Sequence, residues 1–446
     1  MLIFKKMIKI IAFITIIFSL NKLLFFMLDP KSSDSKTMWK SFYQEQNLDT
    51  LFIGSSVCQR TFNPYIIDEI LKTNSFNMGT PAQILSQTYE GINETIKKHK
   101  IKTVVFGIGH FTFTQKENLN AEIAFINAKI EKKDIKEKIK EGMNFTFSKE
   151  HIKKTESINY FFPWIYNNVG FNPKNILENI EAKIKNKNLK NGKENIIYNI
   201  GKGFGIAKIS HDYNNVGNKI SGLIYSNEIY YENFEVLKKI SELCKKNNID
   251  LIVVNSPHTI YDILSYEEDY FLTMYKLKEF FKELEVSYYD FNLVKPSIFQ
   301  SEEDYFYDHE HLNQKGSTEF SKSFVNFMKL REKNEDMDKY FYTPEEYLAS
   351  IKHISIVNFD IEREKSGINI IAKAYTGSKV KVEYEFLIYD DAINEYKVIR
   401  EYNENSKYFY SVIKDKKYKI RVNARQVGTN IPYERYYEKE VEIKDY

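Results

Sequence analysis

The segment 307–311 reads Tyr-Asp-His-Glu-His and gathers two imidazoles and two carboxylates into one short stretch. Far upstream, Ser56 stands two residues after the apolar run 50–54. A serine hydroxyl becomes a nucleophile when an imidazole takes its proton and a carboxylate holds that imidazole in the right tautomer. Asp308 and His311 are three residues apart, so in a turn-like loop the carboxylate can reach Nδ1 of the imidazole. These residues predict acyl transfer through a serine, with Nε2 of His311 directed at Ser56.

The stretch 48–327 must form the scaffold that positions these residues. Short apolar runs alternate there with helical patterns, which predicts a flavodoxin-like α/β fold: a parallel sheet with helices on both faces. The predicted strands are 50–54, 75–79, 103–109, 251–255 and 286–290. In such a sheet the functional residues follow the carboxyl ends of the strands. Ser56 and Gly79 stand at two of these ends.

Three blocks of residues resemble those of the SGNH/GDSL hydrolase superfamily. Gly54-Ser55-Ser56 is similar to the first block, with Ser55 in the place of the usual aspartate, and Asn77-Met78-Gly79 is similar to the second. Asp308-x-x-His311 closely resembles the last block. The resemblance implies an SGNH-type fold in which Ser56 is the nucleophile, His311 the general base and Asp308 the orienting acid. It also implies that the backbone N–H groups of Ser56 and Gly79 form the oxyanion hole.

The third block of the family departs from this pattern. The family has Gly-x-Asn there, whose Asn side chain completes the oxyanion hole, whereas this chain has Gly107-Ile108-Gly109-His110. One lost donor can cost about 10²–10³ in rate, so either His110 or a backbone N–H replaces it, or catalysis is weak. Membrane-anchored relatives that modify cell-surface polymers, the DltD-type and alginate-acetylation proteins, also vary around this pattern. The chain resembles that branch.

Two other chemistries compete for the same residues. The two imidazoles and two carboxylates of 308–311 are ligand types that a metal accepts, but adjacent ligands in one loop rarely converge on one ion, so we predict no metal site. His309 and Glu310 are then expected to face solvent. Cys58 lies two residues from Ser56 and could be taken for the nucleophile. We instead expect a buried small side chain in the following helix.

The N-terminus predicts a membrane anchor. Lys5, Lys6 and Lys9 precede an apolar stretch, 10–28, that is interrupted only by Asn21 and Lys22. Its 19 residues approach the roughly 20 that cross a bilayer, and no small-residue cleavage site follows. The basic start places the N-terminus in the cytoplasm and the rest of the chain outside. We predict a single-pass protein of the cell membrane with an extracytoplasmic catalytic domain.

The remaining regions complete the predicted domain organisation. Residues 1–30 are the anchor, 31–47 a stalk, and 48–335 the catalytic domain with a helical insertion at about 115–232. From 354 onward apolar and polar residues alternate with period two, which indicates an antiparallel β-sandwich. We assign 347–446 to this accessory domain.

Composition and charge argue against some classes of function. The chain has 446 residues with 64 Lys+Arg against 61 Asp+Glu, and this balance argues against a nucleic-acid partner. Two cysteines make no disulfide framework, and no cofactor is expected. The resemblance implies an O-acyltransferase or esterase that acts on a cell-surface glycan or teichoic-acid-type polymer, including D-alanyl transfer as one form. The expected partners are the acylated polymer or a small ester substrate, and a membrane-bound acyltransferase. The competing hypothesis is a non-catalytic surface binding protein with a degenerate fold.

Overall fold

A parallel sheet forms the centre of the α/β region in the computed structural model, which describes residues 2–109, 112–131, 133–185, 196–197, 199–213, 230–364, 366–411 and 416–443. The sheet order is β2-β1-β3-β6-β7, which is the flavodoxin-like order 2-1-3-4-5 when its strands are numbered among themselves. β1 pairs in parallel with β2 and with β3. Its strands are β1 (Thr50–Gly54), β2 (Ser75–Asn77), β3 (Thr103–Ile108), β6 (Asp250–Asn255) and β7 (Ser287–Asp290). The predicted fold class is confirmed.

Helices follow the strands because the sequence supplies both apolar faces and caps. The side chain of Asn63 caps α4, whose first residue is Pro64, and Asn313 caps α13 in the same way; both are favoured helix starts. Every residue of β1 is buried, as expected for a strand covered on both faces. The helices around the sheet are α2 (Asp34–Phe42), α3 (Ser56–Thr61), α4 (Pro64–Leu71), α5 (Leu85–Lys98), α10 (Tyr231–Lys246), α11 (Ile260–Ser265), α12 (Glu267–Glu283) and α13 (Gln314–Glu332).

The insertion is helical and has a small core of its own. Ile123, Ile126, Ile130 and Tyr160 pack together there. Its described elements are α6 (Leu119–Lys129), α7 (Ile135–Thr146), η2 (Thr155–Phe161), η3 (Pro163–Ile165), α8 (Pro173–Ile184), β4 (Ile196–Ile197) and β5 (Ile206–Ala207).

The N-terminal segment forms one long apolar helix, α1 (Leu2–Leu28). Its part Phe4–Leu28 is long and apolar enough to cross a membrane, and none of its most apolar window is buried. Asn21, the polar interruption, accepts a hydrogen bond from Nε1 of Trp164 at 2.7 Å and donates one to the carbonyl of Phe161 at 2.9 Å. The aromatic segment of the insertion therefore satisfies the polar residue that interrupts the apolar run.

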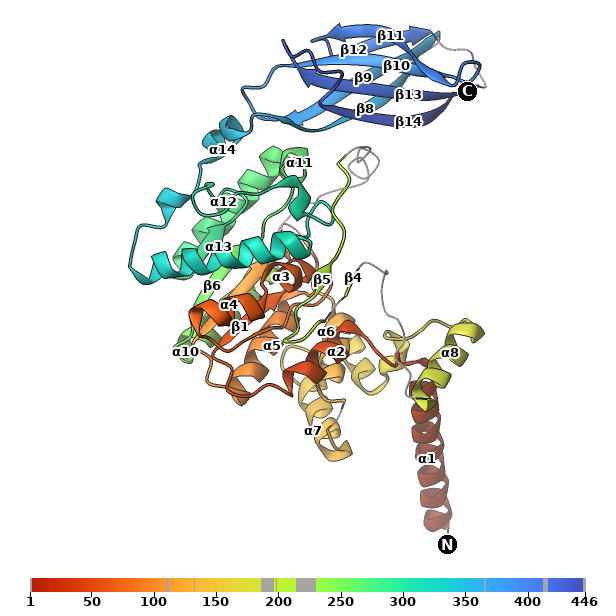
Figure 1. Ribbon diagram of the computed structural model, residues 1–446. Coiled ribbons are helices and arrows are strands. Elements are labelled where there is room, and N and C mark those ends of the chain that lie inside the picture. The colour runs from red at the N-terminus through yellow and green to blue at the C-terminus, as the bar shows by residue number, and fades with distance from the viewer. Residues whose placement is uncertain are drawn as a thin grey trace. The chain divides into compact units, whose positions relative to one another are not determined.

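The C-terminal strands, blue in Figure 1, form two antiparallel sheets of the predicted sandwich. One has the order β11-β10-β13-β14 and the other β12-β9-β8. Alternating residues of both sheets share one core, which includes Phe359, Ile370, Phe386 and Ile420. The strands of the sandwich are β8 (Ile354–Glu364), β9 (Gly367–Thr376), β10 (Val382–Asp390), β11 (Glu395–Asn403), β12 (Lys407–Ser411), β13 (Lys416–Gln426) and β14 (Arg435–Ile443). The short helices η4 (Glu303–Tyr305), η5 (Asp338–Tyr340) and α14 (Pro344–Ser350) precede them in the chain.

The chain divides into two compact units. The first comprises 1–207 and 230–253, and the second 208–229 and 254–446, so the division falls within β6. The domain boundaries set out above stay predictions.

Candidate active site

Ser56 is the first residue of α3, directly after the turn that ends β1. Gly54 and Gly107 are register partners on β1 and β3. A Cβ on Gly54 would lie 2.0 Å from the carbonyl oxygen of Gly107, and one on Gly107 would lie 2.7 Å from Cβ of Cys58. The two glycines thus allow α3 to lie close against the end of the sheet. This approach fixes the position of Ser56, which is half-buried.

Cys58 packs beneath the start of this helix. Its side chain is fully buried, and burial raises the pKa of its thiol, although a hydrogen bond with the backbone of Gly107 opposes the shift. A thiol held in its neutral form is a poor nucleophile. The expected buried, structural position of Cys58 is confirmed.

Asn77 joins the end of β2 to α3. Its Nδ2 donates to the carbonyls of Cys58 at 3.0 Å and Phe62 at 2.9 Å, and its Oδ1 accepts the backbone N–H of Gly79 at 3.0 Å. Gly79 lies so close to α3 that a Cβ there would be 2.6 Å from the backbone nitrogen of Gln59. The N–H proposed as an oxyanion donor thus donates to Asn77 in this structure. The sequence motif contained Asn77 but gave no reason to expect this bridge.

Asp308 and His311 form a hydrogen-bonded pair. Nδ1 of His311 lies 2.9 Å from Oδ1 and 3.0 Å from Oδ2 of Asp308. Oδ1 also accepts the backbone N–H groups of Glu310 at 3.1 Å and His311 at 2.9 Å. Buried Leu312 directly follows His311 and forms an isolated antiparallel β-bridge with Phe306, which closes the loop. The three-residue spacing therefore produces the predicted contact, and the catalytic role of the two residues stays a prediction.

The electrostatics of the pair favour an ionised Asp308. Burial by itself would raise the pKa of this carboxyl, but the charge and hydrogen bond of His311 outweigh burial, with further help from His309 and the Glu310 N–H. The pKa of Asp308 therefore lies well below its usual range. A carboxylate that stays ionised can hold Nδ1–H of His311 and stabilise an imidazolium.

The two residues between Asp308 and His311 are more buried than the sequence predicts. His309 and Glu310 are half-buried rather than solvent-facing. The carbonyl of His309 accepts the N–H of Thr259 at 2.9 Å and its hydroxyl at 3.0 Å, and Oε1 of Glu310 lies 3.7 Å from Nδ1 of His311. These contacts tie the 308–311 loop to the segment that follows β6. Within the described ranges no group of three or more His, Cys, Asp or Glu side chains is arranged to hold a metal ion.

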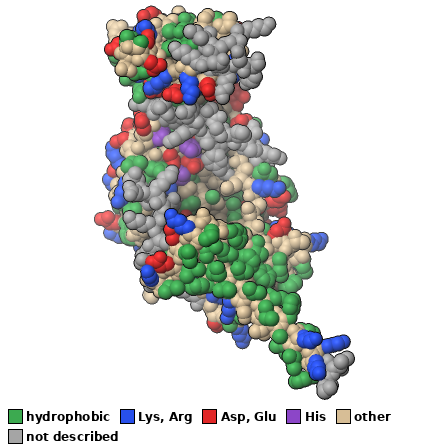
Figure 2. Space-filling model, turned by 90° about the vertical axis from the view of Figure 1, so that its right-hand side faces the viewer, with side chains coloured by type: hydrophobic (Ala, Val, Ile, Leu, Met, Phe, Trp, Pro, Cys, Tyr) green, Lys and Arg blue, Asp and Glu red, His purple; other side chains and the backbone are tan. Residues whose placement is uncertain are grey.

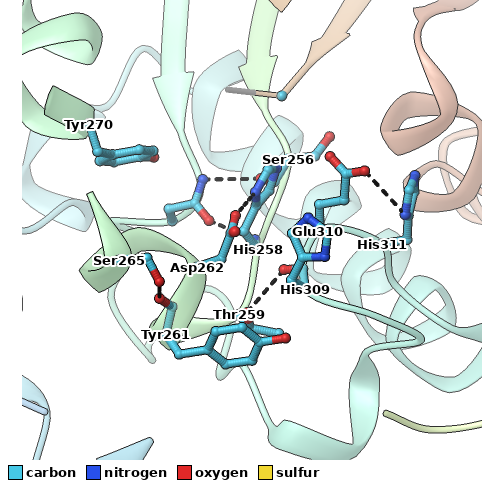
Figure 3. Close-up of polar contacts among 12 residues, drawn as sticks. Ser256, His258, Thr259, Tyr261, Asp262, Ser265, Tyr270, His309, Glu310 and His311 are labelled. Atoms are coloured by element: carbon cyan, nitrogen blue, oxygen red, sulfur yellow. Dashed lines mark hydrogen bonds and ion pairs between the residues drawn. The ribbon is translucent and has the colours of Figure 1, made fainter. Parts of the chain in front are cut away.

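A second His–Asp pair, His258 and Asp262, lies in the same compact unit as Asp308 and His311 (Figure 3). Nδ1 of His258 is 2.7 Å from Oδ2 of Asp262, which also accepts the hydroxyl of Tyr266 at 2.8 Å. The side chains of His258 and Asp262 are 1% and 0% exposed. Burial by itself lowers the pKa of His258, but the hydrogen bond and charge of Asp262 outweigh it, so this pKa lies above its ordinary value. Among the described residues, Nε2 of His258 and Oγ of Ser256 have no hydrogen-bond partner.

His258 lines a cavity of about 930 Å³ in the second unit. Asn292, at the end of β7, accepts the backbone N–H of His258 at 2.7 Å and donates to the carbonyl of Ser256 at 3.1 Å. Glu303 and Arg435 form an ion pair on another wall of the cavity. Sequence reasoning missed His258, although inspecting the residues after the 251–255 strand would have found it, followed by an aspartate one helical turn later.

The predicted site residues fall into both units. Ser56 and Gly79 belong to the first unit, and Asp308 and His311 to the second. His110, the predicted substitute for the missing Asn, lies outside the described residues.

Comparisons with known proteins extend this description only slightly. A protein-family model matches residues 205–331, less than a third of the chain, and no curated protein matches. Among similar solved structures, a GDSL-like lipase from Bacteroides thetaiotaomicron is 10% identical, with a TM-score of 0.30, over 67% of this chain and 100% of its own. A candidate acylhydrolase from Bacteroides fragilis is 9% identical, with a TM-score of 0.29, over 67% of this chain and 94% of its own. At these scores neither structure carries an argument about this chain, so its fold class rests on its own sheet order.

Proposed function

We propose that the protein is an extracytoplasmic serine acyl-transfer enzyme of the SGNH/GDSL type, an O-acyltransferase or esterase. The observation that supports this most directly is the pairing of His311 Nδ1 with an ionised Asp308. Such a pair leaves Nε2 as the basic nitrogen of the imidazole. The strand-end position of Ser56 at the start of α3 supports the same assignment.

In the proposed mechanism Ser56 attacks the carbonyl carbon of an acyl ester. His311 takes the hydroxyl proton as the Oγ–C bond forms, and returns it to the leaving alcohol as the ester C–O bond breaks. The Ser56 acyl ester is then attacked by water or by a polymer hydroxyl, whose proton passes to His311 and back to Ser56. Water gives an esterase and a polymer hydroxyl gives a transferase. Asp308 keeps Nδ1 protonated throughout.

The proposed oxyanion hole consists of backbone donors. The backbone N–H groups of Ser56 and Gly79 are the proposed donors. The Gly79 N–H now donates to Asn77 Oδ1, so it must turn toward, or be shared with, a developing oxyanion. This bond, together with the missing third-block Asn, favours the second candidate function, a non-catalytic surface binding protein.

The proposed substrate is an acylated cell-surface glycan or teichoic-acid-type polymer, with D-alanyl transfer to teichoic acid as one form. α1 would hold the protein on the outer face of the membrane, where such polymers lie. A membrane-bound acyltransferase is the proposed donor partner. No nucleic acid and no cofactor enter the proposal.

A fluorophosphonate probe tests the proposal on the full-length protein, because it labels an activated serine. We expect Ser56 to be labelled and Ser56→Ala to lose the label together with hydrolysis of nitrophenyl acetate. Ser55→Ala is the matched control, since Ser55 is the adjacent half-buried hydroxyl, and it should keep both. Absence of labelling in the folded wild-type protein would favour the binding function.

A further inference from the structure

Helix α7 of the insertion carries an apolar strip on its exposed surface. Ile135, Ile139 and Met143 of α7 (Ile135–Thr146) and Phe147 at its C-cap follow each other at intervals of four and are 58%, 49%, 47% and 57% exposed. Residues four apart lie on one side of a helix. Four large apolar side chains so exposed on one side of one helix are more than the scattered apolar residues of a normal surface.

The other sides of α7 are used differently. Glu137, Lys140 and Asn144 line a polar cleft, and the other residues that line this cleft are all charged. The inner side packs on the insertion, because a Cβ on Gly142 would clash with the ring of Tyr160. The hydroxyl of Thr146 donates to the carbonyl of Ser157 at 3.2 Å. The apolar strip is therefore turned neither to the insertion core nor to the polar cleft.

The strip borders an apolar groove that it shares with the N-terminal helix. This groove, of about 690 Å³, is lined by Ile14, Ile17, Phe18 and Phe25 of α1, by Ile135 and Ile139 of α7, and by the aromatic segment 160–162. Figure 2 shows hydrophobic side chains gathered in a broad patch that continues onto the projecting N-terminal helix. All of these residues belong to the first unit. Around α8, Phe171, Leu177 and Ile184 add further exposed apolar side chains.

The depth of the groove follows from the geometry of α1. With a rise of about 1.5 Å per residue, Phe18 lies about 15 Å along the helix from Leu28, the end of the apolar stretch. This distance is about half of a bilayer's hydrocarbon thickness of roughly 30 Å. Ile135 and Ile139 line the same groove as Phe18 and Phe25, so the start of α7 lies beside the part of α1 that would cross the outer leaflet.

We propose that the strip of α7 lies in the outer leaflet and that the acyl chain of a bilayer phospholipid fills the groove between α7 and α1. Residues 130–185 contain eleven lysines and eight acidic residues, a balance that suits anionic headgroups at the interface. The inference rests on the proposed membrane anchor and is independent of the proposed catalysis. It makes the insertion a second membrane contact that fixes the orientation of the first unit on the bilayer.

Fluorescent labels at adjacent residues of α7 test this inference in the full-length protein. Single cysteines labelled with NBD would be placed by Met143→Cys on the strip and Asn144→Cys on the polar side, and a second pair by Ile139→Cys and Lys140→Cys. All four residues are exposed, so labelling should leave the core intact, and the buried Cys58 and Cys244 should not react in the folded protein. Leu20→Cys, on exposed α1, reports the anchor itself.

The labelled proteins would be placed in nanodiscs of phosphatidylglycerol and phosphatidylethanolamine. We expect lipid-attached doxyl groups to quench the labels at 139 and 143 about threefold more than those at 140 and 144, and aqueous iodide to do the reverse. Equal iodide quenching within both pairs, with the label at 20 quenched by doxyl lipid, would overturn the inference while leaving the anchor. Iodide quenching at 20 would instead remove the anchor, and the inference with it.

Discussion

Oδ1 of Asp308 accepts both the ring Nδ1–H and the backbone N–H of His311, each at 2.9 Å. The same carboxylate oxygen thus closes the loop and orients the imidazole. His309 contributes to the loop through its backbone, because its carbonyl accepts a hydrogen bond from the hydroxyl of Thr259. A side-chain substitution at 309 leaves that carbonyl in place.

This difference predicts unequal effects of the two histidines. His311→Ala should lower the rate of short-chain ester hydrolysis about 10³-fold or more, as removal of a general base does. His309→Ala should lower it less than about tenfold. Asp308→Asn should approach the loss of His311→Ala, since an amide no longer selects the right tautomer. The three rates would be compared at equal thermal stability, and a larger loss in His309→Ala would show that the Asp-x-x-His assignment is wrong.

Local sequence patterns predicted much of the α/β scaffold. The apolar runs located all five strands of the central sheet. The Asp308–His311 contact could be predicted because a three-residue spacing limits where the two side chains can lie. These features depend on neighbours in the sequence, which a single chain displays.

Features that depend on distant neighbours were missed. The bridge from Asn77 to α3 joins residues 15 to 19 positions apart, and nothing local indicates which carbonyls an amide will meet. His258 is held in place partly by Asn292, which lies 34 positions further along the chain and accepts its backbone N–H. The apolar strip of α7 has the period of an ordinary amphipathic helix, so the sequence could not tell whether it faces a core.

Asn77 should be a large contributor to stability. Asn77→Ala removes the donor to two backbone carbonyls and the acceptor of the Gly79 N–H in a fully buried place. Leaving such groups unsatisfied should lower the free energy of unfolding by about 2–4 kcal/mol, measured by chemical denaturation. Asn144→Ala, at an exposed position, should change it by less than about 0.5 kcal/mol. Similar losses in both variants would show that the bridge is not stabilising.

Asn77→Asp separates the two halves of the bridge. Aspartate keeps an acceptor for Gly79 but cannot donate to Cys58 and Phe62 when ionised. We expect a loss of stability at least as large as in Asn77→Ala, because a buried charge would face two carbonyl oxygens. Wild-type stability in this variant would mean that only the acceptor contributes.

The basic start of α1 predicts the topology. Lys5, Lys6 and Lys9 should hold the N-terminus in the cytoplasm, which places residues 29–446 outside. Alkaline phosphatase fused after Tyr446 should therefore be active in intact cells, because this reporter needs an oxidising compartment, and green fluorescent protein at the same place should be dark. A bright green fluorescent fusion with an inactive phosphatase fusion would reverse the assignment.

The buried His258–Asp262 pair should make stability depend on pH in a defined direction. The pKa of His258 is raised in the folded state by its hydrogen bond to Asp262, against the effect of burial, so folding favours the protonated imidazole. The stabilisation is then fully present below the unfolded pKa of about 6.5 and is lost as the pH rises through the higher folded value. The thermal midpoint of the wild-type protein should fall as the pH rises above neutrality, and His258→Gln should reduce that slope. Asp262→Asn should cost about 3–5 kcal/mol, because it leaves a buried imidazole without its charged partner, and should reduce the same slope. An unchanged slope in both variants would show that the pair does not titrate across this range.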